Sequence, residues 1–147
     1  MEKETTVNHT FLFAGLSDIG LVRSRNEDVW GALEEISFFA LADGMGGHQA
    51  GDVASRETLS QMMSLCHTTF STSSKTLLQS CELLKTLIGE VNTRIYQLSK
   101  SVSQYSGMVT TFVSVLFHPD GAILTNVGDS RIYRARKGEC ILLTKDH

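Results

Sequence analysis

Hydrophobic and polar positions follow two different rhythms along the 147-residue chain. Short apolar runs typical of β-strands occur at residues 11–16 and 36–42, with polar residues between them. From Gln49 onward the apolar positions recur at every third or fourth residue, as on one face of an amphipathic helix. The pattern therefore predicts strands and loops first, and then a helix that starts near Gln49.

A second and longer helical pattern follows the Ser/Thr-rich loop at residues 71–75. Its apolar stripe runs from Leu77 to Val102 in steps of three and four. Such a stripe packs either within its own chain or, as in a coiled coil, against a second copy. We favour packing within the chain, with Gly89 allowing close approach, and keep a dimerising adaptor as an alternative.

The last third of the chain returns to the composition of strands. β-branched and aromatic residues dominate four segments, separated by turn residues that include the only proline: 109–117, 122–127, 130–135 and 139–143. These segments predict an antiparallel meander. Strands, two consecutive helices and more strands, without a repeating βαβ unit, predict an α+β fold in which the helical pair covers one face of the sheet.

Composition predicts one soluble domain and excludes several function classes. A hydrophobic fraction of 41% is enough for a single core, and a net charge of −3 provides no basic surface for nucleic acid. The N-terminus has no signal-peptide pattern, and the apolar runs are too short to cross a membrane, so we expect a cytoplasmic protein. Cys66, Cys81 and Cys140 lack the spacing of a disulfide framework or a zinc site, which predicts buried or neutral thiols.

The first candidate for chemistry is the segment LADGMGGH at residues 41–48. Asp43 follows an apolar strand, and Gly44, Gly46 and Gly47 let the main chain approach a ligand without obstruction by Cβ atoms. Carboxylate and carbonyl oxygens are the ligands that Mg²⁺ or Mn²⁺ prefers. Taken alone, however, the segment also fits a flexible glycine-rich loop.

An acidic pair, Glu27 and Asp28, precedes the strand that leads to Asp43. A hairpin that returns at residues 36–42 would bring Asp28 close to Asp43, as a binuclear metal site requires. Arg23, three residues before Asn26, could hold a phosphate dianion through its guanidinium group. A solvated turn and a surface arginine are the alternatives for these residues.

Asp129 lies in the segment GDSR, directly after Gly128 breaks the preceding strand. The glycine should present the carboxylate of Asp129 at a loop. An ordinary turn would explain this segment without any function. A functional role for Asp129 depends on whether it forms one site with Arg23, the acidic pair and Asp43.

Motifs of this kind occur together in a known family. RSRNED, LADGMGGH, GMVTTF and GDSR, in this order and with two helices between the second and third, resemble the metal-dependent serine/threonine protein phosphatases of the PP2C (PPM) family, especially the bacterial form. TKDH at the end of the chain supports the order, and the resemblance runs from about Phe13 to His147. It implies part of an αββα fold, a sandwich of two antiparallel sheets with flanking helices and an active site at one edge.

The resemblance also implies roles for individual residues. Asp43 matches the carboxylate that bridges two metal ions, and the carbonyl of Gly44 matches a ligand of the second ion. Glu27 and Asp28 match the acidic pair that holds this second ion, largely through water. Asp129 matches an aspartate of a third metal site in bacterial members, so that two or three Mg²⁺ or Mn²⁺ ions are implied.

The implied reaction is the hydrolysis of phosphoserine or phosphothreonine by a metal-activated water, with Arg23 binding the substrate phosphate. The implied substrate is a phosphorylated protein, so that the phosphatase would oppose a serine/threonine kinase, and we expect a monomer. Met45 stands where eukaryotic members place a histidine that is the proposed general acid. His48 is the candidate here, and its alternative role is to satisfy the backbone near the start of the helix.

Members of the family are longer than this chain, and the missing part would carry further strands and aspartate ligands. We therefore expect residues 1–147 to be a single phosphatase domain truncated on its C-terminal side. Its ancestry predicts an active phosphatase. The alternative is an inactive fragment or pseudophosphatase that binds metal or a partner, and it predicts little turnover of p-nitrophenyl phosphate by this chain alone.

Overall fold

The computed structural model describes residues 11–46 and 50–147. The described part contains two long helices and seven strands, with short 3₁₀ turns at Glu34–Ile36 and Ser103–Tyr105. In chain order the elements are β1 (Asp28–Leu33), β2 (Phe38–Met45), α1 (Ala50–Phe70), α2 (Leu77–Ser101), β3 (Val109–Thr110), β4 (Phe112–His118), β5 (Gly121–Val127), β6 (Tyr133–Arg136) and β7 (Glu139–Leu142). The predicted α+β class is confirmed.

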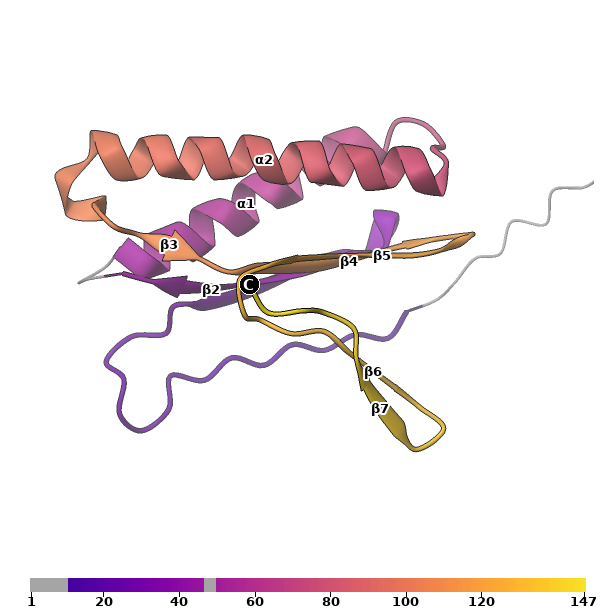
Figure 1. Ribbon diagram of the computed structural model, residues 1–147, viewed down its shortest axis with the longest axis horizontal. Coiled ribbons are helices and arrows are strands. Elements are labelled where there is room, and N and C mark those ends of the chain that lie inside the picture. Colours follow the sequence, from indigo (N-terminus) through magenta and orange to yellow (C-terminus); the bar gives the residue numbers. More distant parts are fainter. Residues whose placement is uncertain (1–10, 47–49) are drawn as a thin grey trace, which may run out of the picture.

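The main sheet is antiparallel, with the strand order β1-β2-β4-β5 and with β3 paired to the end of β2. Both helices lie on one side of this sheet, as Figure 1 shows. The predicted meander is wrong in one respect, because β6 pairs only with β7 in a separate two-stranded sheet. Gly128 explains the departure: its φ of +97° turns the chain out of the main sheet after β5.

The core lies between the helices and the sheet. Alternate residues of β2 point toward the helices, and Phe38, Ala40 and Ala42 are therefore buried while their neighbours are more accessible. The other members of this core come mainly from the helices and from β4 and β5: Ala50, Ala54, Met62, Cys66, Leu84, Leu87, Val91, Ile95, Met108, Phe112, Leu116 and Ile123. One apolar layer thus holds both helices on the strand that leads to Asp43.

The stripe on α2 is used within the chain, as the sequence predicts. Leu84, Val91 and Ile95 are buried in the core, so this stripe is not a free dimerising surface. A capping box formed by Thr76 and Gln79 starts the helix. The role expected of Gly89 is wrong, because a Cβ atom there would meet no other described atom within 4 Å.

The opposite face of the sheet is covered by the segment before β1. The strand expected at residues 11–16 is wrong: the segment is extended but has no strand assignment. Aromatic side chains hold it instead, since the Phe11 ring stacks on Phe117 with centroids 4.5 Å apart, and Phe13 lies 5.4 Å from Phe39. Figure 1 shows this segment and the β6–β7 hairpin on the side away from the helices.

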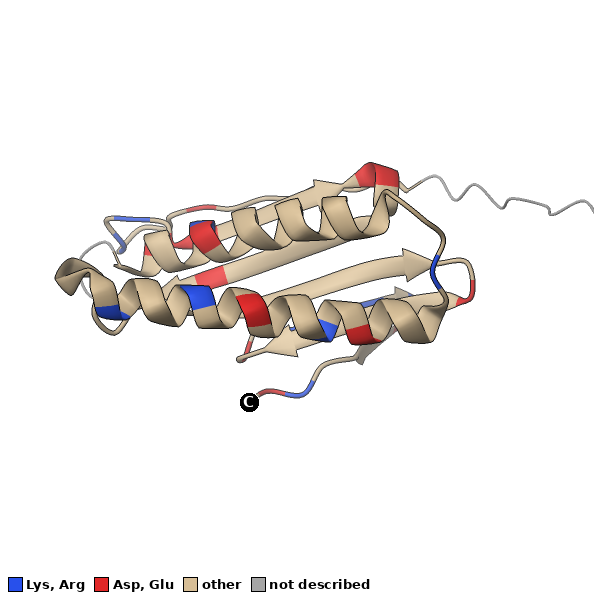
Figure 2. Cartoon of the chain, turned by 90° about the horizontal axis from the view of Figure 1, so that it is seen from above, with Lys and Arg blue, Asp and Glu red and all other residues tan. Residues whose placement is uncertain are grey.

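Charged residues of both signs lie along the helices, and the three cysteines differ in their burial. Acidic and basic residues are interspersed along the helices, as Figure 2 shows. Cys66 is buried, and burial raises the pKa of its thiol to about 12, so this cysteine is neutral as expected. Cys81 and Cys140 are exposed free cysteines, so only Cys66 fits the buried alternative of the prediction. No helix in the described ranges is long and apolar enough to cross a membrane.

Candidate metal centre

The β1–β2 hairpin places two carboxylates side by side. Asp28 and Asp43 are partners in the antiparallel register of these strands. Side chains at such opposed positions point to the same face of the sheet, with Cβ atoms about 5 Å apart. The sequence-based prediction that the hairpin would join Asp28 to Asp43 is therefore confirmed.

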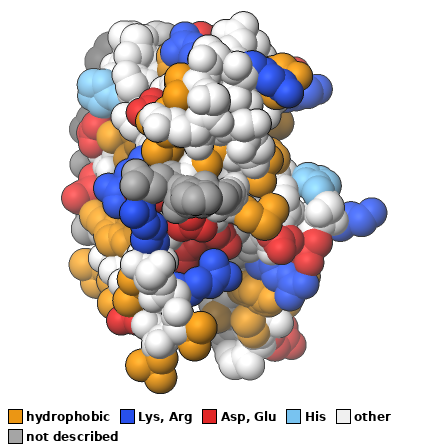
Figure 3. Space-filling model, turned by 90° about the vertical axis from the view of Figure 1, so that its left-hand side faces the viewer, with side chains coloured by type: hydrophobic (Ala, Val, Ile, Leu, Met, Phe, Trp, Pro, Cys, Tyr) orange, Lys and Arg blue, Asp and Glu red, His pale blue; other side chains and the backbone are white. Residues whose placement is uncertain are grey.

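The electrostatic environment of Asp43 shows which other groups surround it. The pKa of its carboxyl group is raised, first by partial burial, next by the charge of Asp28 and a hydrogen bond between the two carboxyl groups, and then by the charge of Asp129. The cationic side chain of Arg23 acts in the opposite direction. Residues from β1, β2 and two loops therefore converge on one site. Figure 3 views this end of the molecule, where acidic side chains lie between basic ones.

Glu27 contributes to the same region through the backbone and through the start of α1. Its carbonyl accepts a hydrogen bond from the N–H of Gly44 at 3.1 Å. Its carboxylate lies against Gly51, since a Cβ atom on this glycine would be 2.8 Å from the carboxylate carbon. A carboxylate at a helix N-terminus is favourable, because the helix dipole places partial positive charge there. Gly51 thus makes room for Glu27, a role that the sequence reasoning missed.

Two threonines after α2 hold the backbone of Asp43 in place. The N–H of Asp43 donates to Oγ1 of Thr111 at 3.1 Å, and its carbonyl accepts from the N–H of Thr111 at 2.8 Å and from the hydroxyl of Thr110 at 3.0 Å. The hydroxyl of Thr111 also lies 2.7 Å from that of Ser130. Thr111 therefore links the end of β2 at Asp43 to the loop of Asp129. The motif GMVTTF was noticed in the sequence, but this positioning role was not.

The loop that carries Asp129 is itself braced by the end of the described chain. A Cβ atom on Gly128 would lie 2.8 Å from a methyl carbon of Thr111, so glycine fits both the contact and the positive φ. The N–H of His147 donates to the carbonyl of Gly128 at 3.1 Å. Arg131 donates to both carboxylate oxygens of Asp146, at 3.0 and 3.2 Å, which lowers the pKa of that carboxyl group.

The residues present fit a divalent cation in part. Mg²⁺ and Mn²⁺ are commonly held by one or two carboxylates, with water completing the coordination, and the pair Asp28–Asp43 provides this. Within residues 11–46 and 50–147, no three His, Cys, Asp or Glu side chains are grouped closely enough to hold one ion. His48, the candidate general acid, lies outside the described residues. The chain thus presents a carboxylate pair rather than a complete protein cage.

The clustered carboxylates should lower the stability of the metal-free folded protein as the pH rises. Because the pKa of Asp43 is raised in the folded state, its contribution to stability is present below its unfolded-state pKa and is lost as the pH rises through the folded value. We expect Asp43→Asn to raise the melting temperature of the chain in EDTA at pH 7 by about 2–4 °C, with a smaller gain at pH 4. Thermal melts followed by circular dichroism test this. Asp120→Asn, at the far β4–β5 turn, is the control, and a lower melting temperature for Asp43→Asn would contradict the prediction.

An antiparallel sheet covered by two helices, with carboxylates gathered at one end of its strands, defines an α+β domain suited to divalent cations. Comparison with known proteins identifies the family to which this domain belongs. The family model described as protein phosphatase 2C matches residues 22–147. The chain is 36% identical to the serine/threonine phosphatase stp of Listeria monocytogenes over 138 residues, which is 89% of this chain and 52% of the relative. The chain belongs to the protein phosphatase 2C family.

Solved structures agree with this assignment. The chain resembles the serine/threonine phosphatase Stp1 from Staphylococcus aureus with a TM-score of 0.79 and 30% identity, covering 95% of this chain and 57% of Stp1. It also resembles the catalytic domain of the serine/threonine protein phosphatase PstP in complex with two manganese ions, with a TM-score of 0.76 and 36% identity over 89% of this chain and 54% of that catalytic-domain chain. The chain therefore spans about half the length of these relatives.

Proposed function

We propose that the whole protein is a metal-dependent serine/threonine protein phosphatase. The observation that carries the proposal is the convergence of Asp28, Asp129 and Arg23 on Asp43. The names of the relatives support it, and one neighbour was crystallised with two manganese ions. The pair Asp28–Asp43, with Asp129 and Arg23 within electrostatic reach of Asp43, fits the chemistry of divalent cations and a phosphate dianion together.

The metal ligands in this proposal come from the paired ends of β1 and β2 and from the loop after β5. Glu27, Asp28, Asp43 and the carbonyl of Gly44 would hold two Mg²⁺ or Mn²⁺ ions, with Asp43 contributing to both, and Asp129 would hold a third. When bound, the ions would supply a water of near-neutral pKa as the nucleophile. The task of Thr110 and Thr111 is to fix the main chain on both sides of the Asp43 carboxylate through the three hydrogen bonds already described.

In this proposal Arg23 binds the substrate and His48 donates a proton. Arg23 holds the non-bridging oxygens of the phosphoryl group and offsets the charge that they gain in the transition state. Two features suit Arg23 to this role. Its charge lowers the pKa of Asp43, so it lies within electrostatic reach of the carboxylates, and it lies on an exposed loop, where a large substrate has access. His48 would protonate the leaving alkoxide of serine or threonine.

The substrate in this proposal is a phosphorylated protein, as the names of the relatives suggest. An opposing serine/threonine kinase, a monomeric state and a cytoplasmic location stay predictions from the sequence. The 147 residues form the N-terminal portion of one phosphatase domain in this proposal, which is supported by their match to about half of the Listeria relative and of Stp1. The family assignment does not favour the alternative of a pseudophosphatase.

Binding of Mn²⁺ tests the metal centre without requiring turnover. We expect substoichiometric Mn²⁺ to broaden the amide NMR signals of Asp28, Asp43 and Thr111 in the isolated chain, because a paramagnetic ion between the two carboxylates lies close to all three. Asp28→Asn and Asp43→Asn should each weaken this effect at least tenfold. Asp120→Asn is the matched control and should leave it unchanged. Broadening that is equal in all variants would overturn the metal centre.

An assay with p-nitrophenyl phosphate and Mn²⁺ then examines the isolated chain. Little or no turnover is expected, because the carboxylate pair alone does not supply the full ligand set of a binuclear site. Robust turnover that disappears with Asp43→Asn would show instead that the described half is sufficient.

A further inference from the structure

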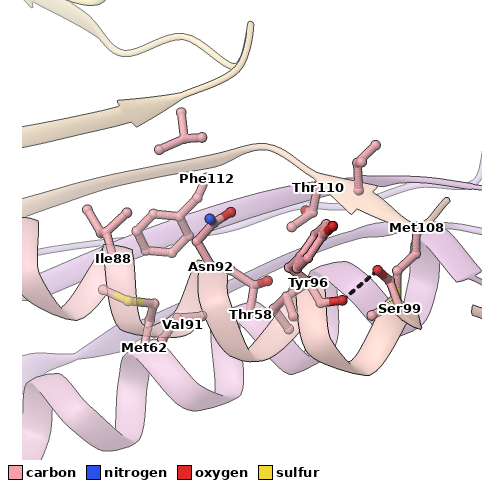
Figure 4. Close-up of a pocket in the computed structure, with 13 residues that line it drawn as sticks. Thr58, Met62, Ile88, Val91, Asn92, Tyr96, Ser99, Met108, Thr110 and Phe112 are labelled. Atoms are coloured by element: carbon pink, nitrogen blue, oxygen red, sulfur yellow. Dashed lines mark hydrogen bonds between the residues drawn. The ribbon is translucent and has the colours of Figure 1, made fainter. Parts of the chain in front are cut away.

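A cavity lies on the helix side of the sheet, apart from the carboxylates. It has a volume of about 190 Å³ and is lined by α1, α2, β3 and the start of β4. Figure 4 shows Thr58 and Met62 of α1 facing residues of α2, with Phe112 and Thr110 along one side. Most of its lining side chains are apolar, and none of them carries a formal charge. The cavity therefore suits a neutral molecule.

One polar group in this cavity has no partner. The Thr58 side chain is only 7% exposed, and its hydroxyl forms no hydrogen bond with any described residue. By contrast, the hydroxyl of Ser99, which also lines the cavity, donates to the carbonyl of Tyr96 at 2.7 Å. A buried hydroxyl without a partner costs about 1–3 kcal/mol. A ligand that satisfies it recovers part of this cost, so Thr58 marks where the polar group of a ligand would sit.

The size of the cavity limits what can enter. Cavities of about 150 Å³ with apolar walls hold a single benzene ring. Asn92 and Tyr96 are exposed residues of the lining, so the cavity has access to solvent on the α2 side. We propose that this cavity is a binding site for a neutral one-ring molecule that carries one hydroxyl or N–H group, with the Thr58 hydroxyl as its hydrogen-bond partner.

The site is connected to Asp43 by one residue. Thr110 lines the cavity, and its hydroxyl donates to the carbonyl of Asp43 at 3.0 Å. It also pairs with Gly44 in the β2–β3 register. A ligand that packs against Thr110 would therefore contact a residue that holds the backbone next to the carboxylate pair. The binding site itself is independent of the proposed phosphatase function, and only an effect on metal binding would rest on that function.

The test compares phenol with toluene, which differ by the hydrogen-bonding group. NMR titrations of the labelled 147-residue chain should give saturable shifts for the methyl groups of Met62, Ile88 and Val91, and for the amide of Thr110. Phenol should bind at least fivefold more tightly than toluene to the wild-type chain. In Thr58→Val the preference should disappear, and in Thr58→Ser, which keeps the hydroxyl, it should remain.

Thr68→Val is the control on the same helix, because its exposed hydroxyl bonds only to the carbonyl of Ser64. This variant should keep the full preference for phenol. The proposal is overturned if the shifts grow linearly without saturation, if they fall outside the cavity, or if Thr58→Val retains the preference. Loss of Mn²⁺ binding by the chain would leave the phenol result unaffected, so failure of the proposed function and failure of this site are distinguishable.

Discussion

Gly44→Ala is expected to destabilise the chain by about 3 kcal/mol or more, which is a large effect for the addition of one methyl group. A Cβ atom at Gly44 would lie 2.0 Å from the carbonyl oxygen of Gly51 and 2.5 Å from its carbonyl carbon. These are backbone atoms of α1, so no side-chain rotation relieves the overlap. Gly51 cannot easily retreat either, because the carboxylate of Glu27 lies against it. The end of β2 and the first turn of α1 would have to separate.

Gly89→Ala is the matched control for this prediction. Gly89 lies inside α2, and a Cβ atom there would meet no described atom within 4 Å. Alanine should therefore stabilise the chain by about 0.5–1 kcal/mol, through its higher helix propensity. Urea unfolding followed by circular dichroism measures both changes. Similar stabilities for the two variants would show that the close approach of Gly44 and Gly51 is unimportant.

Gly44→Ala should also damage the candidate metal centre. The N–H of Gly44 donates to the carbonyl of Glu27, and the preceding residue is Asp43. A shift of the backbone here moves the carboxylate pair even in molecules that stay folded. Broadening by Mn²⁺ near Asp28 should weaken in this variant, whereas Gly89→Ala should bind the ion as the wild type does.

Local periodicity is what made the helices and the hairpin predictable. The stripe from Leu77 to Val102 repeats over many turns, and the observed helix, α2, spans Leu77–Ser101. The apolar run at residues 36–42 likewise marked β2. Residues 11–16 have an equally apolar composition but form no strand, and their aromatic rings pack on the sheet instead. Composition alone does not distinguish these two outcomes.

The candidate site was predictable where the chain folds back on itself over a short distance. Asp28 and Asp43 are joined by one hairpin, so their approach followed from the order of strand and turn. The resemblance to a family supplied the roles of Arg23 and Asp129. Thr111 was missed because its hydrogen bond to Asp43 joins residues 68 positions apart, and pairing of β3 with β2 cannot be deduced from either segment alone. The cavity beside Thr58 depends on how well side chains fill space, which no sequence pattern reports.

Phe38→Ala is expected to cost about 3–5 kcal/mol, because the ring is completely buried between β2 and the helices. Truncation leaves a cavity under the apolar layer that fixes α1 and α2 on the sheet. Since the end of β2 carries Asp43, this layer also supports the candidate metal centre. Urea unfolding of the isolated chain measures the loss.

Phe39→Ala is the informative comparison, because it removes the same side chain one position later. Phe39 points to the opposite face, where it contacts Phe13 and Phe117 and stays half-buried. The expected cost is about 1–2 kcal/mol, in proportion to the smaller apolar area that it removes from water. Equal losses for the two variants would mean that the segment before β1 holds its face of the sheet as firmly as the helices hold theirs. A twofold or larger difference would show that the stability of this chain resides on the helix side of β2.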